Sequence, residues 1–174
     1  RYEEIDKAIS MLNESLKSRW TALGYAKQDT CITADTDFKQ SLRFRNFSGG
    51  LHFDFGKGTL SMLVKTTNDE QARNVDTLSG GEKSFSQISL LLATWRPMRS
   101  RIIALDEFDV FMDQVNRTIG TKLIMSKLSV ETRTQTIIIT PQDIGKIANF
   151  NDPGIRIHKM RDPQRQSNSN FYSQ

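Results

Sequence analysis

The sequence predicts an α/β fold in which a parallel sheet with flanking helices lies beside an antiparallel β meander, with a helical neck in front of both. Three patterns predict it. Apolar residues recur at helical spacing at the start of the chain, alternate with polar residues between Ser41 and Val64, and form short apolar runs at 102–105 and 136–140. With 174 residues, 37% of them hydrophobic, the chain has the size of one globular domain and can bury a core.

Composition excludes several classes of protein. The single cysteine, Cys31, excludes an internal disulfide and favours a reducing, intracellular compartment. No apolar stretch approaches the roughly 18 residues of a membrane-spanning helix, and the charged start at 1–4 is not a signal peptide. The formal charge of +4 allows contact with a polyanion without requiring it. We therefore expect a soluble intracellular protein with no membrane association.

A neck helix with the spacing of a coiled coil is predicted over residues 1–20. Its apolar residues, spaced 3, 4, 3 and 4 apart, are Tyr2, Ile5, Ile9, Leu12 and Leu16. This spacing is the seam of a coiled coil, but fewer than three heptads fit an amphipathic helix lying on its own domain equally well. Because the chain is already helical in pattern at Arg1 and lacks an initiator methionine, we expect a segment upstream.

Period-two alternation between Ser41 and Val64 predicts three antiparallel strands joined as a meander. The glycines of segments 48–50 and 56–58 are expected in the tight turns, which need residues with positive φ. Residues 68–74 lack periodicity and are predicted to form a loop.

The second half of the chain is predicted to form a βαβ unit behind a helix. The expected elements are a helix from Glu82 to Trp95 that stops at Pro97, a short buried strand at 101–105, a helix around 115–124 and a fully buried strand at 136–140. A short helix at 144–150 and a strand at 155–160 are expected to follow. We expect residues 21–161 to form one lobe and the polar residues 162–174 a flexible tail.

The segment Leu78-Ser79-Gly80-Gly81-Glu82 combines a helix cap with two glycines. Ser79 and Glu82 fit a capping box, in which the hydroxyl accepts the amide of residue 82 and the carboxylate reaches back. The box does not explain two glycines in a first helical turn, where each costs roughly 1 kcal/mol of helix propensity. Residues without side chains let a phosphate approach the free amides, and the helix dipole favours its charge. The segment therefore indicates contact with a phosphate.

Asp106 and Glu107 follow an apolar strand, at the end where open α/β sheets place their ligands. A carboxylate there can hold Mg²⁺, and the next one can orient or deprotonate the water that attacks a γ-phosphate. The chain has no Gly-x-x-x-x-Gly-Lys-Ser/Thr loop, which residues 80–84 only imitate. An acidic pair alone also fits a solvated strand end, but together with the upstream segment it predicts half of an ATP site.

Together these residues resemble the ATP-binding-cassette class. Leu78 to Glu82 matches its signature motif, 102–107 its Walker B strand and Asp113 its D-loop aspartate. With a coiled-coil stub in front and the Walker A half absent, the chain is similar to the carboxyl-terminal half of the ATPase head in the structural maintenance of chromosomes (SMC) family. Residues 110–113 depart from the Ala-Ala-Leu-Asp usual in cohesin and condensin heads, which favours another member of that family.

The resemblance implies an active site that is shared between chains. Asp106 and Glu107 would be catalytic, with Asp106 also holding Mg²⁺. The residues that would contact ATP are Leu78, Ser79, Gly80, Gly81, Lys83, Asp113 and Gln142. Gln142 stands near the place where many cassette ATPases have a switch histidine, and it could contact the γ-phosphate instead. His52 and His158 lie in strand patterns and receive no catalytic role.

The resemblance also implies the partners and the cellular role. The partners would be the amino-terminal half of the same head, the head of a different SMC protein, a kleisin, other non-SMC subunits and DNA. With ATP and Mg²⁺ as cofactors, the cycle would drive DNA entrapment or loop extrusion in repair, recombination and chromosome maintenance, in the nucleus and on chromosomes. Basic residues at Arg43, Arg45 and 156–165 could contribute to DNA contact, although such runs are usually solvated faces.

Two other functions stay open. The chain could be a non-catalytic interaction module that binds a partner SMC protein and a kleisin, which the intact pair Asp106 and Glu107 argues against. It could also be the head of another split-head repair ATPase, which residues 110–112 and 140–143 argue against.

Overall fold

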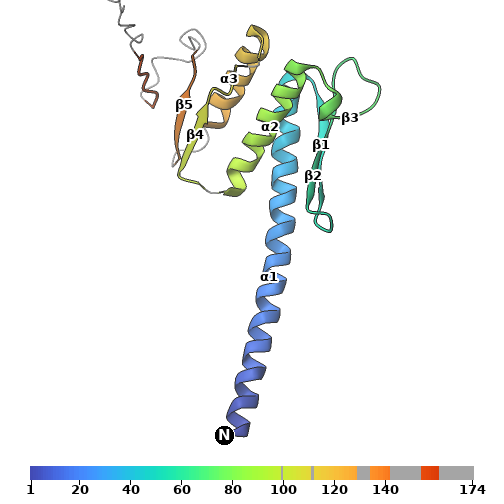
Figure 1. Ribbon diagram of the computed structural model, residues 1–174, viewed down its shortest axis with the longest axis vertical. Helices are drawn as coiled ribbons and strands as arrows, with labels where there is room; N and C mark the ends of the chain where they lie inside the picture. Colours follow the sequence, from blue (N-terminus) through green and yellow to red (C-terminus); the bar gives the residue numbers. More distant parts are fainter. Residues whose placement is uncertain (99, 111, 129–133, 142–153, 161–174) are drawn as a thin grey trace, which may run out of the picture.

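The computed structural model describes residues 1–98, 100–110, 112–128, 134–141 and 154–160. A long helix stands beside a small α/β lobe (Figure 1). The elements in chain order are α1 (Tyr2–Leu42), η1 (Arg43–Arg45), β1 (Ser48–Asp54), β2 (Thr59–Lys65), β3 (Arg73–Asn74), η2 (Val75–Thr77), α2 (Gly80–Met98), β4 (Ile102–Asp106), α3 (Gln114–Leu128) and β5 (Gln135–Ile139). Helix α2 lies between α1 and the unit formed by β4, α3 and β5 (Figure 1).

Helix α1 continues without a break past residue 20 and ends at Leu42, which gives it a length of 41 residues. Its residues 1–30 are all exposed, so the apolar seam does not lie on its own lobe among the described residues. Only the last turns are buried, at Ala34, Asp37, Phe38, Ser41 and Leu42. The neck helix is therefore anchored at one end and projects an apolar stripe into solvent.

Helix α1 is anchored to the lobe partly through two carboxylates. Asp35 accepts the Leu51 N–H of β1 at 2.8 Å and pairs with Lys39 at 2.6 Å, so the helix covers the edge of the antiparallel sheet. The buried Asp37 lies 3.5 Å from the Lys127 amine of α3 and 3.9 Å from the Arg96 guanidinium of α2.

The antiparallel sheet has three strands in the order β1-β2-β3, but the prediction placed two parts of it wrongly. Residues 41–45 end α1 and form η1, and the third strand is Arg73–Asn74, in the segment predicted as a loop. Glycines 49 and 50 lie inside β1 and not in a turn. Position 49 needs a glycine because a Cβ there would stand 2.1 Å from the Leu63 carbonyl oxygen of β2. The turn predicted at 56–58 is confirmed, with Gly58 at φ +65°.

Strands β4 and β5 pair in parallel, from Ile102 opposite Gln135 to Asp106 opposite Ile139, which confirms the predicted βαβ unit. The prediction that the second strand is fully buried is wrong. Ile103, Leu105 and Ile138 face the core, whereas Ile102, Ile137 and Ile139 are 61%, 44% and 56% exposed. The sheet therefore has a covered face and an open apolar face in the part of the chain that the structure describes.

Two further predictions differ from the structure, one in whether a strand forms and one in where a helix ends. Residues 155–160 form no strand, because no neighbouring strand pairs with them in the described part of the chain, and Met160 is 87% exposed. Helix α2 includes Pro97 and ends one residue later, at Met98. The helix predicted at 144–150 and the tail at 162–174 lie outside the described residues.

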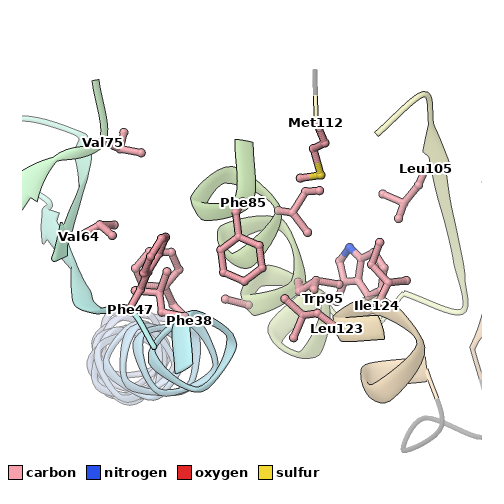
Figure 2. Close-up of a cluster of buried hydrophobic side chains, with 14 of the residues drawn as sticks. Phe38, Phe47, Val64, Val75, Phe85, Trp95, Leu105, Met112, Leu123 and Ile124 are labelled. Atoms are coloured by element: carbon pink, nitrogen blue, oxygen red, sulfur yellow. The ribbon is translucent and has the colours of Figure 1, made fainter. Parts of the chain in front are cut away.

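The core is one cluster of buried apolar side chains with Phe85 of α2 at its centre (Figure 2). Phe85 is fully buried, and its ring meets the Phe47 ring edge-on with the centroids 6.0 Å apart. Phe38 and Val64 lie on one side of Phe85, toward α1 and the antiparallel sheet, and Leu105 lies on the other, in the βαβ unit (Figure 2).

Truncation of Phe85 tests whether this cluster holds the lobe together. We expect Phe85→Ala to lower the free energy of unfolding by about 3–5 kcal/mol, because it removes a buried ring and leaves a cavity. Leu91→Ala on the same helix is the matched control; Leu91 is 38% exposed, so a cost well below that range is expected. Urea denaturation measures both, and equal losses would contradict the central role of Phe85.

Candidate nucleotide-engaging site

The signature segment forms the start of α2. The Ser79 N–H donates to Oε2 of Glu82 at 3.0 Å, and the Lys83 N–H donates to the Ser79 carbonyl at 2.8 Å. The carboxylate half of the predicted capping box is therefore confirmed. The hydroxyl half is absent: within the described residues, Oγ of Ser79 accepts no hydrogen bond from the Glu82 amide. Leu78 is buried beneath the segment, whereas Ser79 is exposed.

The two glycines of the signature segment have different surroundings. A Cβ on Gly81 would stand 2.4 Å from Nδ2 of Asn116 and 3.5 Å from Oδ2 of Asp113, so packing against the start of α3 requires a glycine there. A Cβ on Gly80 would meet nothing within 4 Å. In the part of the chain that the structure describes, no neighbour explains a glycine at position 80, and the space above it is open to an outside ligand.

Asp113 lies beside Gly81 and caps α3. Its Oδ1 accepts the Asn116 N–H at 2.7 Å, and its Oδ2 accepts the Asn116 side-chain amide at 2.8 Å. The pKa of Asp113 is held below its usual value, first by the backbone hydrogen bond from Asn116 and last by the positive charge of Arg45. The structure thus brings Asp113 and the signature glycine together, with both carboxylate oxygens occupied by the cap.

Arg43 and Arg45 lie in the segment that was predicted to begin the antiparallel meander, and this prediction is wrong. Arg45 lies in η1, with its guanidinium 4.6 Å from the Phe47 ring centroid and 5.6 Å from that of Phe85. Its Nη1 is buried with no hydrogen-bond partner among the described residues. Arg43, two residues earlier, is exposed. The Arg45 guanidinium therefore packs on the aromatic rings of the core and does not belong to an exposed basic surface.

Asp106 and Glu107 lie at the carboxyl end of β4, and both are exposed. The Glu107 N–H donates to the Ile139 carbonyl of β5 at 2.9 Å, and Glu107 has φ +48°, a left-handed conformation that is uncommon outside glycine. Because α2 and β4 run in opposite directions, the start of α2 and the end of β4 lie toward the same end of the lobe (Figure 1). Both motifs are thus accessible from one side.

The remaining predicted site residues are placed less favourably. Nζ of Lys83 lies 2.8 Å from Oδ1 of Asp76, an ion pair that a phosphate would have to replace. Gln142 lies outside the described residues. In the described part of the chain no group of three His, Cys, Asp or Glu side chains could hold a metal ion. Asp106 alone still fits Mg²⁺, which commonly takes one or two carboxylates together with substrate phosphates and water.

Helices that could cross a membrane are absent from the described residues.

Comparison with known proteins identifies the family. No family model matches the chain. Over 173 residues, 99% of the chain, the sequence is 64% identical to structural maintenance of chromosomes protein 6 of Saccharomyces cerevisiae. The chain belongs to the SMC family. It spans 16% of the length of that relative. The prediction that the chain is not of the cohesin or condensin type is confirmed by this similarity to protein 6.

Two solved structures show the same fold. An SMC head bound to the C-winged helix domain of ScpA superposes with a TM-score of 0.58 at 21% identity, over 67% of this chain and 37% of that one. A second structure comes from work on the ATP-driven dimerization and DNA-stimulated activation of SMC ATPases. It superposes with a TM-score of 0.58 at 20% identity, over 67% of this chain and 71% of that one. The predicted fold class, that of an SMC ATPase head, is confirmed.

The two signature glycines form a natural pair for mutation. We expect Gly81→Ala to lower the free energy of unfolding by about 1–3 kcal/mol, because the new methyl displaces Asn116. Gly80→Ala enters open space and should keep or raise stability, by up to about 1 kcal/mol of helix propensity. Thermal unfolding of both variants measures the difference, and equal destabilisation would refute the distinction.

Proposed function

We propose that this chain is the carboxyl-terminal half of an SMC ATPase head, which turns over ATP only when an amino-terminal half supplies the phosphate-binding loop and an opposing head engages. One observation carries the proposal: the chain presents an accessible signature segment and an accessible acidic pair on one side of the lobe, yet contains no phosphate-binding loop. Each motif is complete, but neither can hold a nucleotide alone.

The open face of the β4-β5 sheet supports the first partner. Its exposed isoleucines, Ile102, Ile137 and Ile139, form an apolar surface that a folded protein normally covers. A parallel sheet is stable with both faces covered, so the amino-terminal half of the head would cover this face and extend the sheet at its edge with further strands. The same half would bring the Walker A loop to the end of β4.

The residues of the chain would divide the chemistry between two nucleotides. On its own head, Asp106 would hold Mg²⁺, which would neutralise charge on the phosphates, and Glu107 would orient and deprotonate the attacking water. Toward the opposing head, the Ser79 hydroxyl and the amides of Gly80 and Gly81 would bind the phosphates of the other ATP. Two ATP molecules would thus join the heads, and hydrolysis would release them.

The family suggests the protein partners, and the exposed apolar stripe on the neck helix α1 suggests a helical one. SMC protein five is the proposed opposing head, with a kleisin and other non-SMC subunits attached. The solved SMC head bound to ScpA and the structure described by ATP-driven dimerization support this assembly. The exposed stripe of α1 would pair with the returning helix of a coiled coil. The complex would act on DNA in the nucleus, on chromosomes, in repair and recombination.

A non-catalytic interaction module is the second candidate. The stripe on α1 favours it, since Leu12 and Leu16 are 64% and 63% exposed and need a partner whether or not ATP is hydrolysed. Partner binding through the neck is compatible with catalysis, so hydrolysis itself has to decide.

ATP turnover by mixtures of parts tests the proposal. The chain is assayed alone, with the amino-terminal half of its head, and with the opposing head added. We expect turnover only in the full mixture, and we expect Glu107→Gln to lower kcat by about 10²–10⁴-fold, the usual contribution of a general base. Turnover by the isolated chain would mean that it holds a phosphate-binding loop of its own. Normal turnover with Glu107→Gln would remove this residue from the mechanism.

Substitution of Ser79 tests the contact with the opposing head. Ser79→Arg should block ATP-dependent head engagement, because a long cation fills the open space beside Gly80, while ATP binding by its own head is retained. Gln87→Arg, an exposed position later in α2, is the control and should leave engagement unchanged. Crosslinking or sedimentation of the heads with ATP measures the outcome. Heads that still dimerise with Ser79→Arg would overturn the role of the signature segment.

A further inference from the structure

We propose that Asp109 and Thr140 form a latch that positions Glu107 for hydrolysis; the inference rests on the proposed ATPase function. Asp109 is fully buried, in the loop between β4 and α3. The hydroxyl of Thr140, the residue that follows β5, lies 3.0 Å from Oδ1 and 2.9 Å from Oδ2 of Asp109. A side-chain contact thus joins two segments 31 residues apart, next to the proposed catalytic carboxylate.

Arg117 of α3 completes the latch from the other side. Its Nε lies 3.4 Å from Oδ2 of Asp109, an ion-pair contact without hydrogen-bond alignment. Its Nη2 donates to the Met112 carbonyl at 2.9 Å, and the Met112 N–H donates to the Asp109 carbonyl at 3.1 Å. The buried carboxylate therefore has a cation and a hydroxyl as partners, as a charge removed from water requires.

The latch acts at the same place as the backbone contact of Glu107. The Glu107 N–H donates to the carbonyl of Ile139, and Ile139 directly precedes Thr140. Two successive residues at the end of β5 thus hold two residues of the loop, Glu107 and Asp109. Glu107 is kept at φ +48°, which costs about 1–3 kcal/mol and persists only where the surroundings enforce it. Without the latch, the loop can relax toward ordinary backbone angles and carry the Glu107 carboxylate away from its working position.

Neither Asp109 nor Thr140 touches a reacting atom in this scheme, so both are positioning residues. They would set kcat and leave nucleotide affinity alone, because the phosphates are held by the amino-terminal half and by the opposing signature segment. A displacement of about 1 Å at a reacting group can cost on the order of a hundredfold in rate. The latch thus determines how precisely the Glu107 carboxylate is positioned. Asp113, at the other end of the loop, would still cap α3.

The test uses the assembled pair of heads. Thr140→Val removes the hydroxyl at nearly constant shape and is expected to lower kcat about tenfold or more, with the KM for ATP and head engagement close to wild type. The melting temperature should fall modestly, because the buried Asp109 carboxylate loses a hydrogen-bond partner. Thr140→Ser restores the hydroxyl and should restore kcat. Thr136→Val, within β5, is the matched control, since Oγ1 of Thr136 is buried without a hydrogen-bond partner among the described residues; it should leave kcat unchanged.

A second variant separates positioning from folding. Asp109→Asn keeps the shape of the side chain and is expected to lower kcat as well, and the double variant with Thr140→Val should be no slower than the slower single variant. An unchanged kcat in Thr140→Val, or a loss of kcat that is fully accounted for by lost head engagement, would overturn the latch. If wild type and Glu107→Gln hydrolyse ATP equally poorly, the proposed function fails first and this inference falls with it.

Discussion

Burial of Phe85 joins the parts of this lobe that would otherwise be independent. Helix α2 carries it between α1 with the antiparallel sheet on one side and the βαβ unit on the other (Figure 2). A two-stranded parallel sheet and a three-stranded meander are each too small to be stable alone, so their common contact with α2 determines that they fold together. Because the same helix begins at the signature segment, the core also fixes where Gly80 and Gly81 stand.

Charged side chains hold the loop between β4 and α3 in addition to the apolar core. Asp113 caps α3 beside Gly81, and the Arg45 guanidinium lies over the rings of Phe47 and Phe85. Asp109 ties the preceding part of the same loop to the end of β5. The segment between the acidic pair and α3 is thereby fixed at several points, which is unusual for a connection on the surface of a protein.

The sequence predicted what depends on local pattern. A short stretch of sequence was enough to recognise helix α2, the two parallel strands, and the motifs at Leu78–Glu82 and Asp106–Glu107. The errors concern distant neighbours. Nothing near Gly49 reveals that the Leu63 carbonyl stands where its Cβ would be, and β3 has only two residues, too few for a period. Asp109 and Arg45 were missed as structural groups because their partners come from other elements.

The anchoring of α1 at one end alone makes it a lever. About 45 Å of helix, residues 1–30, extends beyond its buried turns at the usual rise per residue. A rotation of the base by only about five degrees would carry Tyr2 through about 4 Å at that rise per residue. The base contacts α2 through the core and both α2 and α3 through Asp37. Any small tilt of these helices would thus become a displacement of several ångströms at the far end of the neck.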